Sequence, residues 1–118
     1  MYSNPSYSRM GYGNKVNQYL VKEILEATPQ QLLIKIYDFA ITNCQKHDMV
    51  RTNNALQELI NSLSFEGEAV RNVSTGLLRL YKFCQEQMRA QNYDIVYKIL
   101  TELRETWMDA FQKAGKIK

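Results

Sequence analysis

The single histidine, His47, and the two cysteines, Cys44 and Cys84, are the residues best suited to bind a metal ion or to act in catalysis. They form neither a CxxC motif nor a Cys/His cluster, so no zinc site is predicted. A di-iron helical bundle requires Glu-x-x-His pairs that project inward, and one histidine cannot supply them. A serine or cysteine nucleophile would also lack a convincing base. We therefore expect no enzyme, no metal and no cofactor, and we interpret His47 as a solvated loop residue.

Both cysteines lie on apolar stripes at helical spacing, which is typical of buried thiols. A disulfide is the alternative, and a reducing compartment would disfavour it. The carboxylates fall on polar helical faces, where they pair with basic residues at helical spacing, as Asp109 does with Lys113. These patterns need no catalytic explanation.

Aromatic and sulfur-containing side chains are the more informative group, with 8 Tyr, 4 Phe and 5 Met residues. Such side chains are favoured at protein interfaces, and methionine-containing grooves adapt to a partner helix. The alternative is that they fill the core of the fold. Most of them are expected to do so, and the question is which apolar residues remain on the surface.

A strong helix start lies at Thr28, Pro29 and Gln31. Thr28 can cap the first turn with its hydroxyl, Pro29 suits the first helical position, and Gln31 can complete a capping box. The helix predicted over 29–46 is apolar around most of its circumference, well beyond the stripe of roughly 100° that a surface helix needs. It should therefore be buried on several sides, or buried on one side and covered by a partner.

The rest of the chain shows no strand signal, and the periodicity predicts further helices over 49–63, 68–90 and 95–113. Asp48 and Asp94 are the expected caps of the second and fourth of these long helices. Connections of about three to six residues favour antiparallel neighbours, so we predict an all-α fold, an antiparallel four-helix bundle. Gly76, inside the third helix, indicates either the close approach of another helix or a tolerated weak point.

The N-terminal part is predicted to contain a flexible, tyrosine-rich tail over 1–14 and a short helix or arm over 15–26. An arm of about three turns is marginal alone and must dock on another surface. Its apolar stripe makes it a candidate lid over the exposed flank of the 29–46 helix. A basic tail follows over 114–118.

The net charge of +3 comes from the two ends of the chain, because residues 1–15 carry +2, residues 113–118 carry +3 and residues 16–112 carry −2. A nucleic-acid-binding module more often concentrates positive charge on one structured face, so no nucleic-acid partner is expected. No apolar run approaches the roughly 18–20 residues of a membrane span, and no signal-peptide pattern is present. These features predict a cytoplasmic location without membrane insertion.

Several motifs together resemble the flagellin export chaperone family (FliS). The main one comprises Tyr19, Ile24, Ala27-Thr28-Pro29, Leu32 and Ile36-Tyr37-Asp38, and two more are Leu77-x-x-Leu80-Tyr81-x-Phe83 and Leu103-Arg104-Glu105-Thr106-Trp107. The likeness covers about residues 19–111. Phe39 stands where the family often has a small glycine.

The resemblance implies a chaperone that holds the disordered C-terminal segment of flagellin and prevents its polymerisation before secretion. It implies flagellin as the partner, with the flagellar export gate as a further candidate and a weak homo-oligomer as another option. The residues predicted to bind the partner are Tyr19, Ile24, Leu32, Ile36, Phe39, Leu56, Ile60, Leu80 and Tyr81.

Two other functions are compatible with the same residues. One is a helical adaptor or self-associating bundle with no role in export. The other is a bundle that binds nucleic acid through its basic tails, in which case binding should vanish when both tails are deleted.

Overall fold

The computed structural model describes residues 27–117, and within that range it contains helices and no strand. The elements are α2 (Pro29–Gln45), α3 (Met49–Asn61), α4 (Glu68–Arg89) and α5 (Tyr93–Lys113). The predicted all-α class is confirmed. The tail predicted over 1–14 and the arm predicted over 15–26 lie outside the described residues.

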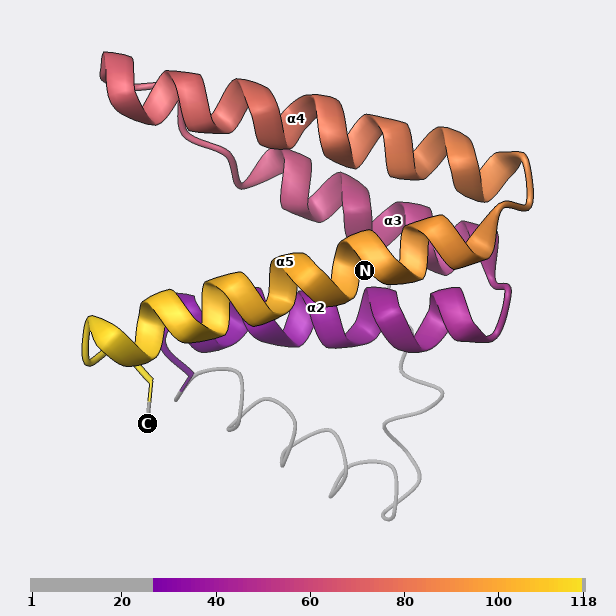
Figure 1. Cartoon of the computed structure of the whole chain (residues 1–118), viewed down its shortest axis with the longest axis horizontal. Helices are drawn as coiled ribbons and strands as arrows, with labels where there is room; N and C mark the ends of the chain where they lie inside the picture. Colours follow the sequence, from indigo (N-terminus) through magenta and orange to yellow (C-terminus); the bar gives the residue numbers. More distant parts are fainter. Residues whose placement is uncertain (1–26, 118) are drawn as a thin grey trace, which may run out of the picture.

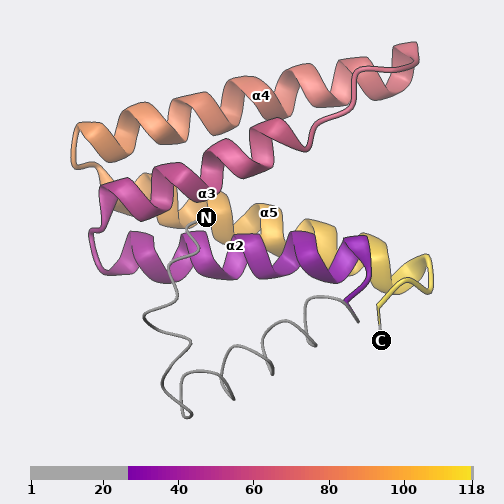
Figure 2. The ribbon, with the colours of Figure 1, turned by 180° about the vertical axis from the view of Figure 1, so that it is seen from behind.

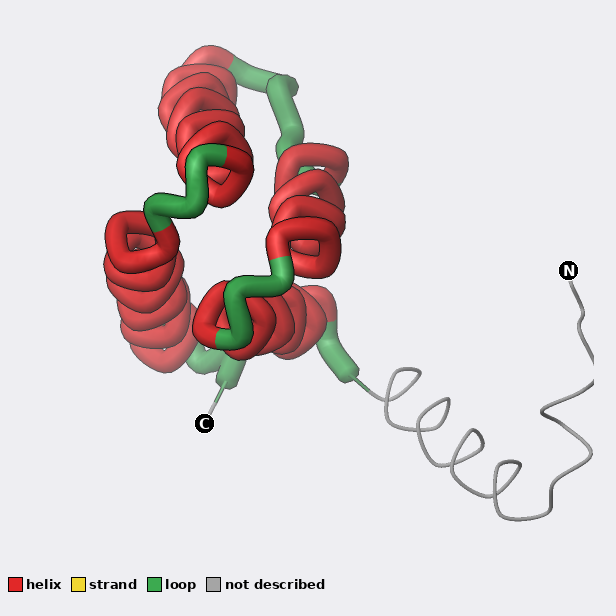
Figure 3. The backbone as a smooth tube through the Cα atoms, turned by 90° about the vertical axis from the view of Figure 1, so that its right-hand side faces the viewer, coloured by secondary structure: helices red, strands yellow, loops and turns green. Residues whose placement is uncertain are grey.

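The four helices form a ring, and each helix packs against its two neighbours in that ring (Figure 3). Helix α2 packs against α3 and α5, and α4 packs against the same two helices from the opposite side. Successive helices run in opposite directions (Figure 1). The fold is therefore the antiparallel four-helix bundle that the short connections predicted.

The start of α2 is fixed by the predicted capping box. The backbone N–H of Gln31 donates to Thr28 Oγ1 at 3.1 Å, and the N–H of Thr28 donates to Gln31 Oε1 at 2.9 Å. Pro29 occupies the first turn, where its missing N–H costs nothing. Helix α3 begins in a similar way, because the N–H of Arg51 donates to Asp48 Oδ1 at 3.0 Å.

Helices α2 and α4 each end in a left-handed residue, His47 with φ 60° and Gln91 with φ 64°. At these turns the N–H of Asp48 donates to the carbonyl of Asn43 at 2.9 Å, and that of Asn92 donates to the carbonyl of Gln87 at 2.8 Å. This hydrogen-bond pattern satisfies the last free carbonyls of a helix and reverses the chain within a few residues. It holds α2 beside α3 and α4 beside α5.

The predicted start of the last helix was wrong by two residues. Asn92, and not Asp94, stands at the cap position, and α5 begins at Tyr93. The left-handed turn at Gln91 directs the chain into the next helix at once, so a four-residue turn does not form. Asp94 lies in the first turn, where its negative charge suits the positive end of the helix dipole.

The core is a single apolar cluster to which all four helices contribute. Its fully or almost fully buried members include Tyr37, Leu56, Leu59, Tyr81, Cys84, Met88, Val96 and Leu100. Cys44 and Cys84 are buried and free, as the thiol interpretation predicted. The predicted Asp109–Lys113 ion pair forms on the surface at 3.1 Å, and Arg104 pairs with Asp38 of α2.

The bundle is closed at one end and open at the other. It is closed where the turns at His47 and Gln91 hold the helices together, whereas the start of α4 diverges from the end of α5 (Figures 1 and 2). The contact between α4 and α5 is correspondingly the least extensive of the four neighbouring pairs. Gly76 lies in the diverging part, and a Cβ atom there would meet no other atom within 4 Å. No neighbouring helix approaches Gly76 closely, so the structure supports the second interpretation, that Gly76 is a tolerated weak point of the helix.

The capping box at Thr28 gives a first prediction. Thr28→Ala should lower the free energy of unfolding by about 0.5–2 kcal/mol, because the N–H of Gln31 loses its acceptor. Urea denaturation monitored by circular dichroism would measure it. Thr42→Ala is the matched control, since Thr42 is an exposed residue inside the same helix, and it should leave the midpoint nearly unchanged. Equal effects of the two substitutions would contradict the assigned helix start.

A second prediction concerns Thr52, which is fully buried and whose hydroxyl finds no hydrogen-bond partner among the described residues. An unsatisfied buried hydroxyl costs free energy, so Thr52→Val should raise the free energy of unfolding, by up to about 1–3 kcal/mol. Thr75→Val serves as the control, because the exposed Thr75 hydroxyl already donates to the carbonyl of Arg71. A destabilising Thr52→Val would mean that the hydroxyl is satisfied.

Candidate partner-binding surface

The described residues do not meet the requirements of a metal site, because they contain no group of three or more His, Cys, Asp or Glu residues placed to hold a metal ion. The His47 ring stacks on Tyr93 with 4.0 Å between ring centroids, at the surface of the closed end. The described residues also form two hollows with mainly apolar linings.

The first hollow, here called the α2–α3 groove, has a volume of about 720 Å³. Leu32, Ile36 and Phe39 form its α2 wall, at the i, i+4 and i+7 spacing of one helical face. Phe39 remains 49% exposed although it is large and apolar. Ala55 and the polar side chains of Asn54, Gln57 and Glu58 form the α3 wall. The groove thus has an apolar floor beside a polar rim.

The width of the apolar face of α2 explains this groove. Ile34, Tyr37, Ala40 and Cys44 are the buried apolar residues of α2. Leu32, Ile36 and Phe39 lie on the adjoining face, next to α3, and are left half-buried or exposed. The apolar sequence of α2 predicts more apolar surface than the core alone would cover, and the burial pattern agrees.

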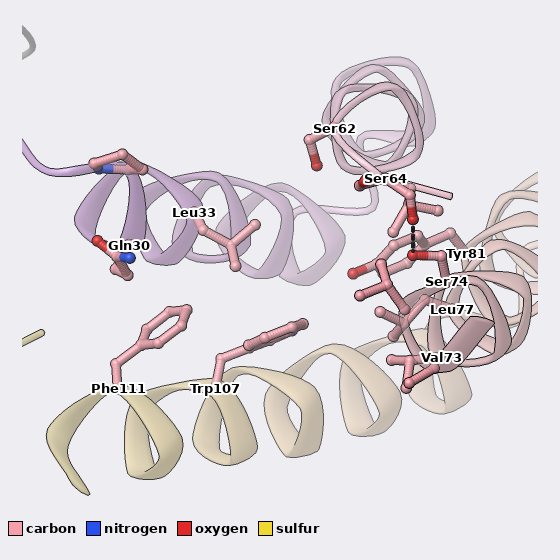
Figure 4. A pocket seen from close by; sticks show the side chains of 14 residues that line it. Gln30, Leu33, Ser62, Ser64, Val73, Ser74, Leu77, Tyr81, Trp107 and Phe111 are labelled. Carbon is pink, nitrogen blue, oxygen red and sulfur yellow. Dashed lines mark hydrogen bonds between the residues drawn. The ribbon is translucent and has the colours of Figure 1, made fainter. Parts of the chain in front are cut away.

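The second hollow, here called the open mouth, lies at the open end of the bundle and has a volume of about 640 Å³. Trp107 and Phe111 of α5 and Leu33 of α2 point into it, and they face Val73 and Leu77 of α4 (Figure 4). The Trp107 and Phe111 rings stack with 5.4 Å between centroids. The mouth is a wedge whose walls are two diverging helices.

No sequence pattern predicts the open mouth. Val70 and Val73 begin the apolar stripe of α4 at helical spacing, yet they are 46% and 61% exposed. Their stripe continues without a break into Leu77 and Tyr81, which pack in or against the core. No sequence signal marks where along α4 the helix leaves its neighbours, because periodicity gives the direction of a side chain and not the distance to the next helix.

A cluster of polar aromatic groups lies at the base of the open mouth. The hydroxyls of Tyr37 and Tyr81 are hydrogen-bonded at 2.5 Å, and Trp107 Nε1 donates to the Tyr37 hydroxyl at 3.0 Å. Burial raises the pKa of Tyr37 well above its ordinary value, and the neighbouring Tyr81 adds to this shift. Burial also raises the pKa of Tyr81. These hydroxyls are therefore structural hydrogen-bonding groups that stay protonated at neutral pH.

A family model described as "Flagellar protein FliS" matches residues 12–114, which is most of the chain. The chain belongs to the FliS family. No curated protein and no solved structure gives a match.

Membership of the FliS family carries a general function, that of a flagellar export chaperone, and with it a protein partner. The FliS proteins are chaperones and not enzymes, in agreement with the expectation drawn from the chain's chemistry. Among the described residues, no helix combines the length and the apolar character that crossing a membrane would require.

The nine residues predicted to bind the partner fall into different places in this FliS fold. Leu32, Ile36 and Phe39 come together in the α2–α3 groove. Ile60 and Leu80 are half-buried, Ile60 against the core and Leu80 on α4. Tyr19 and Ile24 lie outside the described residues.

Two of the nine require correction. Leu56 is fully buried and Tyr81 is 2% exposed, so neither presents a side chain to a partner in this conformation. Leu56 lies on the inward stripe of α3 with Thr52 and Leu59. Tyr81 is held inside by its hydrogen bond to Tyr37. Leu56 is a core residue, whereas Tyr81 lines the base of the open mouth with almost no exposed area of its own.

The buried ionisable groups give a prediction for alkaline pH. Burial raises the pKa of Cys84 to about 12, and the folded state likewise favours the neutral form of Tyr37. The unfolded chain therefore loses these protons first, so stability is fully present below pH 9 and is lost as the pH rises from about 9 toward 12. Urea denaturation at each pH would measure this decline in the free energy of unfolding.

Tyr37→Phe isolates the contribution of one of these groups. The variant should be less stable at pH 7 by about 1–3 kcal/mol, because Trp107 Nε1 and the Tyr81 hydroxyl lose a partner. Above pH 10 its stability should fall less steeply than that of the parent chain, since one titrating group is gone. An identical slope in both proteins would contradict the assignment of Tyr37 to the alkaline loss.

Proposed function

We propose that this protein binds the C-terminal segment of flagellin in the cytoplasm and prevents it from polymerising before secretion. The observation that carries the proposal is the α2–α3 groove, where Leu32 and Ile36 are half-buried and Phe39 is 49% exposed. Membership of the FliS family supplies the context of flagellar export. The export gate stays a prediction as a further partner.

The chemistry of the groove suits an amphipathic helix. Partner helices commonly place residues at i, i+3, i+4 and i+7 into an apolar groove of this kind. The wall residues Leu32, Ile36 and Phe39 offer a matching row. Lys35 and Glu58 line the same groove and give it charges of both signs for fixing the register of a bound helix.

A disordered partner that folds on binding spends part of the interaction energy on ordering itself, so it needs a large contact area. The α2–α3 groove supplies one part of that area. The predicted arm over 15–26, with Tyr19 and Ile24, is proposed to cover the groove in the free protein and to give way to the partner. Its tether at Thr28 would keep its effective concentration high, of roughly millimolar order.

Isothermal titration of the full chain with a peptide of the flagellin C-terminal segment tests the proposal directly. Light scattering of flagellin under polymerising conditions, with and without the chain, adds the functional readout. We expect saturable one-to-one binding and suppressed polymerisation. The absence of both, together with self-association in analytical ultracentrifugation, would favour the adaptor or self-associating bundle instead.

The groove makes a residue-specific prediction. Phe39→Asp should weaken peptide binding at least about tenfold, because burying a phenylalanine side chain contributes roughly 1.5–3 kcal/mol and 1.4 kcal/mol corresponds to tenfold in Kd. Phe83→Asp is the matched control, since Phe83 is also exposed, at 40%, but lies on α4 outside the groove. Circular dichroism must show that both variants are folded under the conditions of the titration. Equal loss of binding in the two variants would remove the groove from the proposal.

A further inference from the structure

The open mouth is bounded on one side by a segment that is weakly tied to the rest of the bundle, residues 68–76 of α4. Its side chains Val70 and Val73 face the mouth but remain 46% and 61% exposed. Across the mouth, Trp107 and Phe111 are half-buried and present their rings to the same space (Figure 4). Two apolar walls thus face each other across the open mouth.

The hydrogen bonds of this segment are all local. Ser74 Oγ donates to the carbonyl of Ser64, Arg71 donates to the carbonyl of Phe65 at 3.3 Å, and Thr75 donates to the carbonyl of Arg71. Among the described residues, none of its hydrogen bonds reaches α2 or α5. The segment and the preceding loop are therefore connected to each other and can move together.

The remainder of α4 is anchored in a different way. Tyr81, Cys84 and Met88 are buried in the core, and Tyr81 is hydrogen-bonded to Tyr37 of α2. Gln85 Nε2 donates to the carbonyl of Asn53, and Asn53 Nδ2 donates to the carbonyl of Gln85, both at 3.2 Å. This exchange of hydrogen bonds fixes the register of α4 against α3. The firm anchoring ends at about Leu77.

Gly76 lies at the boundary between the two parts. A glycine inside a helix is less favourable than alanine by about 0.8–1 kcal/mol, because its backbone has more freedom to lose. The space around its Cα is open, so packing does not require a glycine at this position. Gly67 is the N-cap residue of α4 and offers no side chain to cap the first turn. The helix is therefore weakest at the two ends of this segment.

We propose that residues 68–76 form a flap that bends at Gly76 and closes the open mouth against Trp107 and Phe111. Closure would bury the exposed faces of Val70 and Val73 with the two rings, and the removal of this apolar surface from water would drive it. The loop 62–67 moves with the flap through the Ser74–Ser64 hydrogen bond. The free protein thus exchanges between the open form described here and a form whose second apolar hollow is hidden.

Pulsed electron paramagnetic resonance on the full chain tests the flap. Nitroxide labels at Glu68→Cys and Gln112→Cys report the distance between the start of α4 and the end of α5, since both positions are exposed. Cys44 and Cys84 are fully buried and should not react, which labelling of the parent chain would verify. We expect two populations of distance, one from the open form and one that is shorter.

Substitutions then test whether the shorter distance comes from the closed flap. Val73→Ser should reduce it at least about threefold, because the closed form buries less apolar surface. Val50→Ser is the matched control, since Val50 is also 61% exposed but lies on α3, and it should change nothing. Gly76→Ala should reduce the shorter population about fivefold by stiffening the helix.

A single distance population in the parent chain would overturn the proposal. So would a shorter population that persists unchanged in both Val73→Ser and Gly76→Ala. The measurement needs no partner protein, so its outcome does not depend on whether the α2–α3 groove binds flagellin.

Discussion

The hydrogen-bonded cluster of Tyr37, Tyr81 and Trp107 is the interaction on which the rest of this bundle depends. It connects α2, α4 and α5 through side chains that are apolar over most of their area and polar at one atom. Each polar atom must find a partner when it is buried, which restricts how the helices can rotate and slide against one another. The cluster also marks the place where the close packing of the closed end gives way to the open mouth.

The difference between the two ends follows from the connections. The turns at His47 and Gln91 reverse the chain through left-handed residues and hold their helices at contact distance. The connection at the other end, from Ser62 to Gly67, is longer and lets α4 start away from α5. Its hydrogen bonds to the following helix are local, so nothing in it draws α4 inward. A bundle closed at one end and open at the other is a natural consequence.

This asymmetry gives a FliS protein two apolar surfaces of different character. The α2–α3 groove lies between helices that pack closely, so its shape is set by the core behind it. The open mouth lies between helices that diverge, so its shape depends on the position of the first half of α4. In the proposed function, the α2–α3 groove would set the register of a bound segment and the open mouth would adjust to it.

The sequence by itself determined the helical class, the number of long helices and the start of α2, because periodicity, capping residues and turn chemistry are local properties that a few neighbouring side chains decide. It also indicated that α2 has more apolar surface than the core requires, and Leu32, Ile36 and Phe39 bear this out. The tertiary structure alone decided which apolar residues are covered. Leu56 and Tyr81 proved to be core residues, whereas Val70 and Val73 proved to be exposed. Burial depends on the distance to the next helix, and that distance is set by long-range packing and by the spread of the bundle, which no local pattern records.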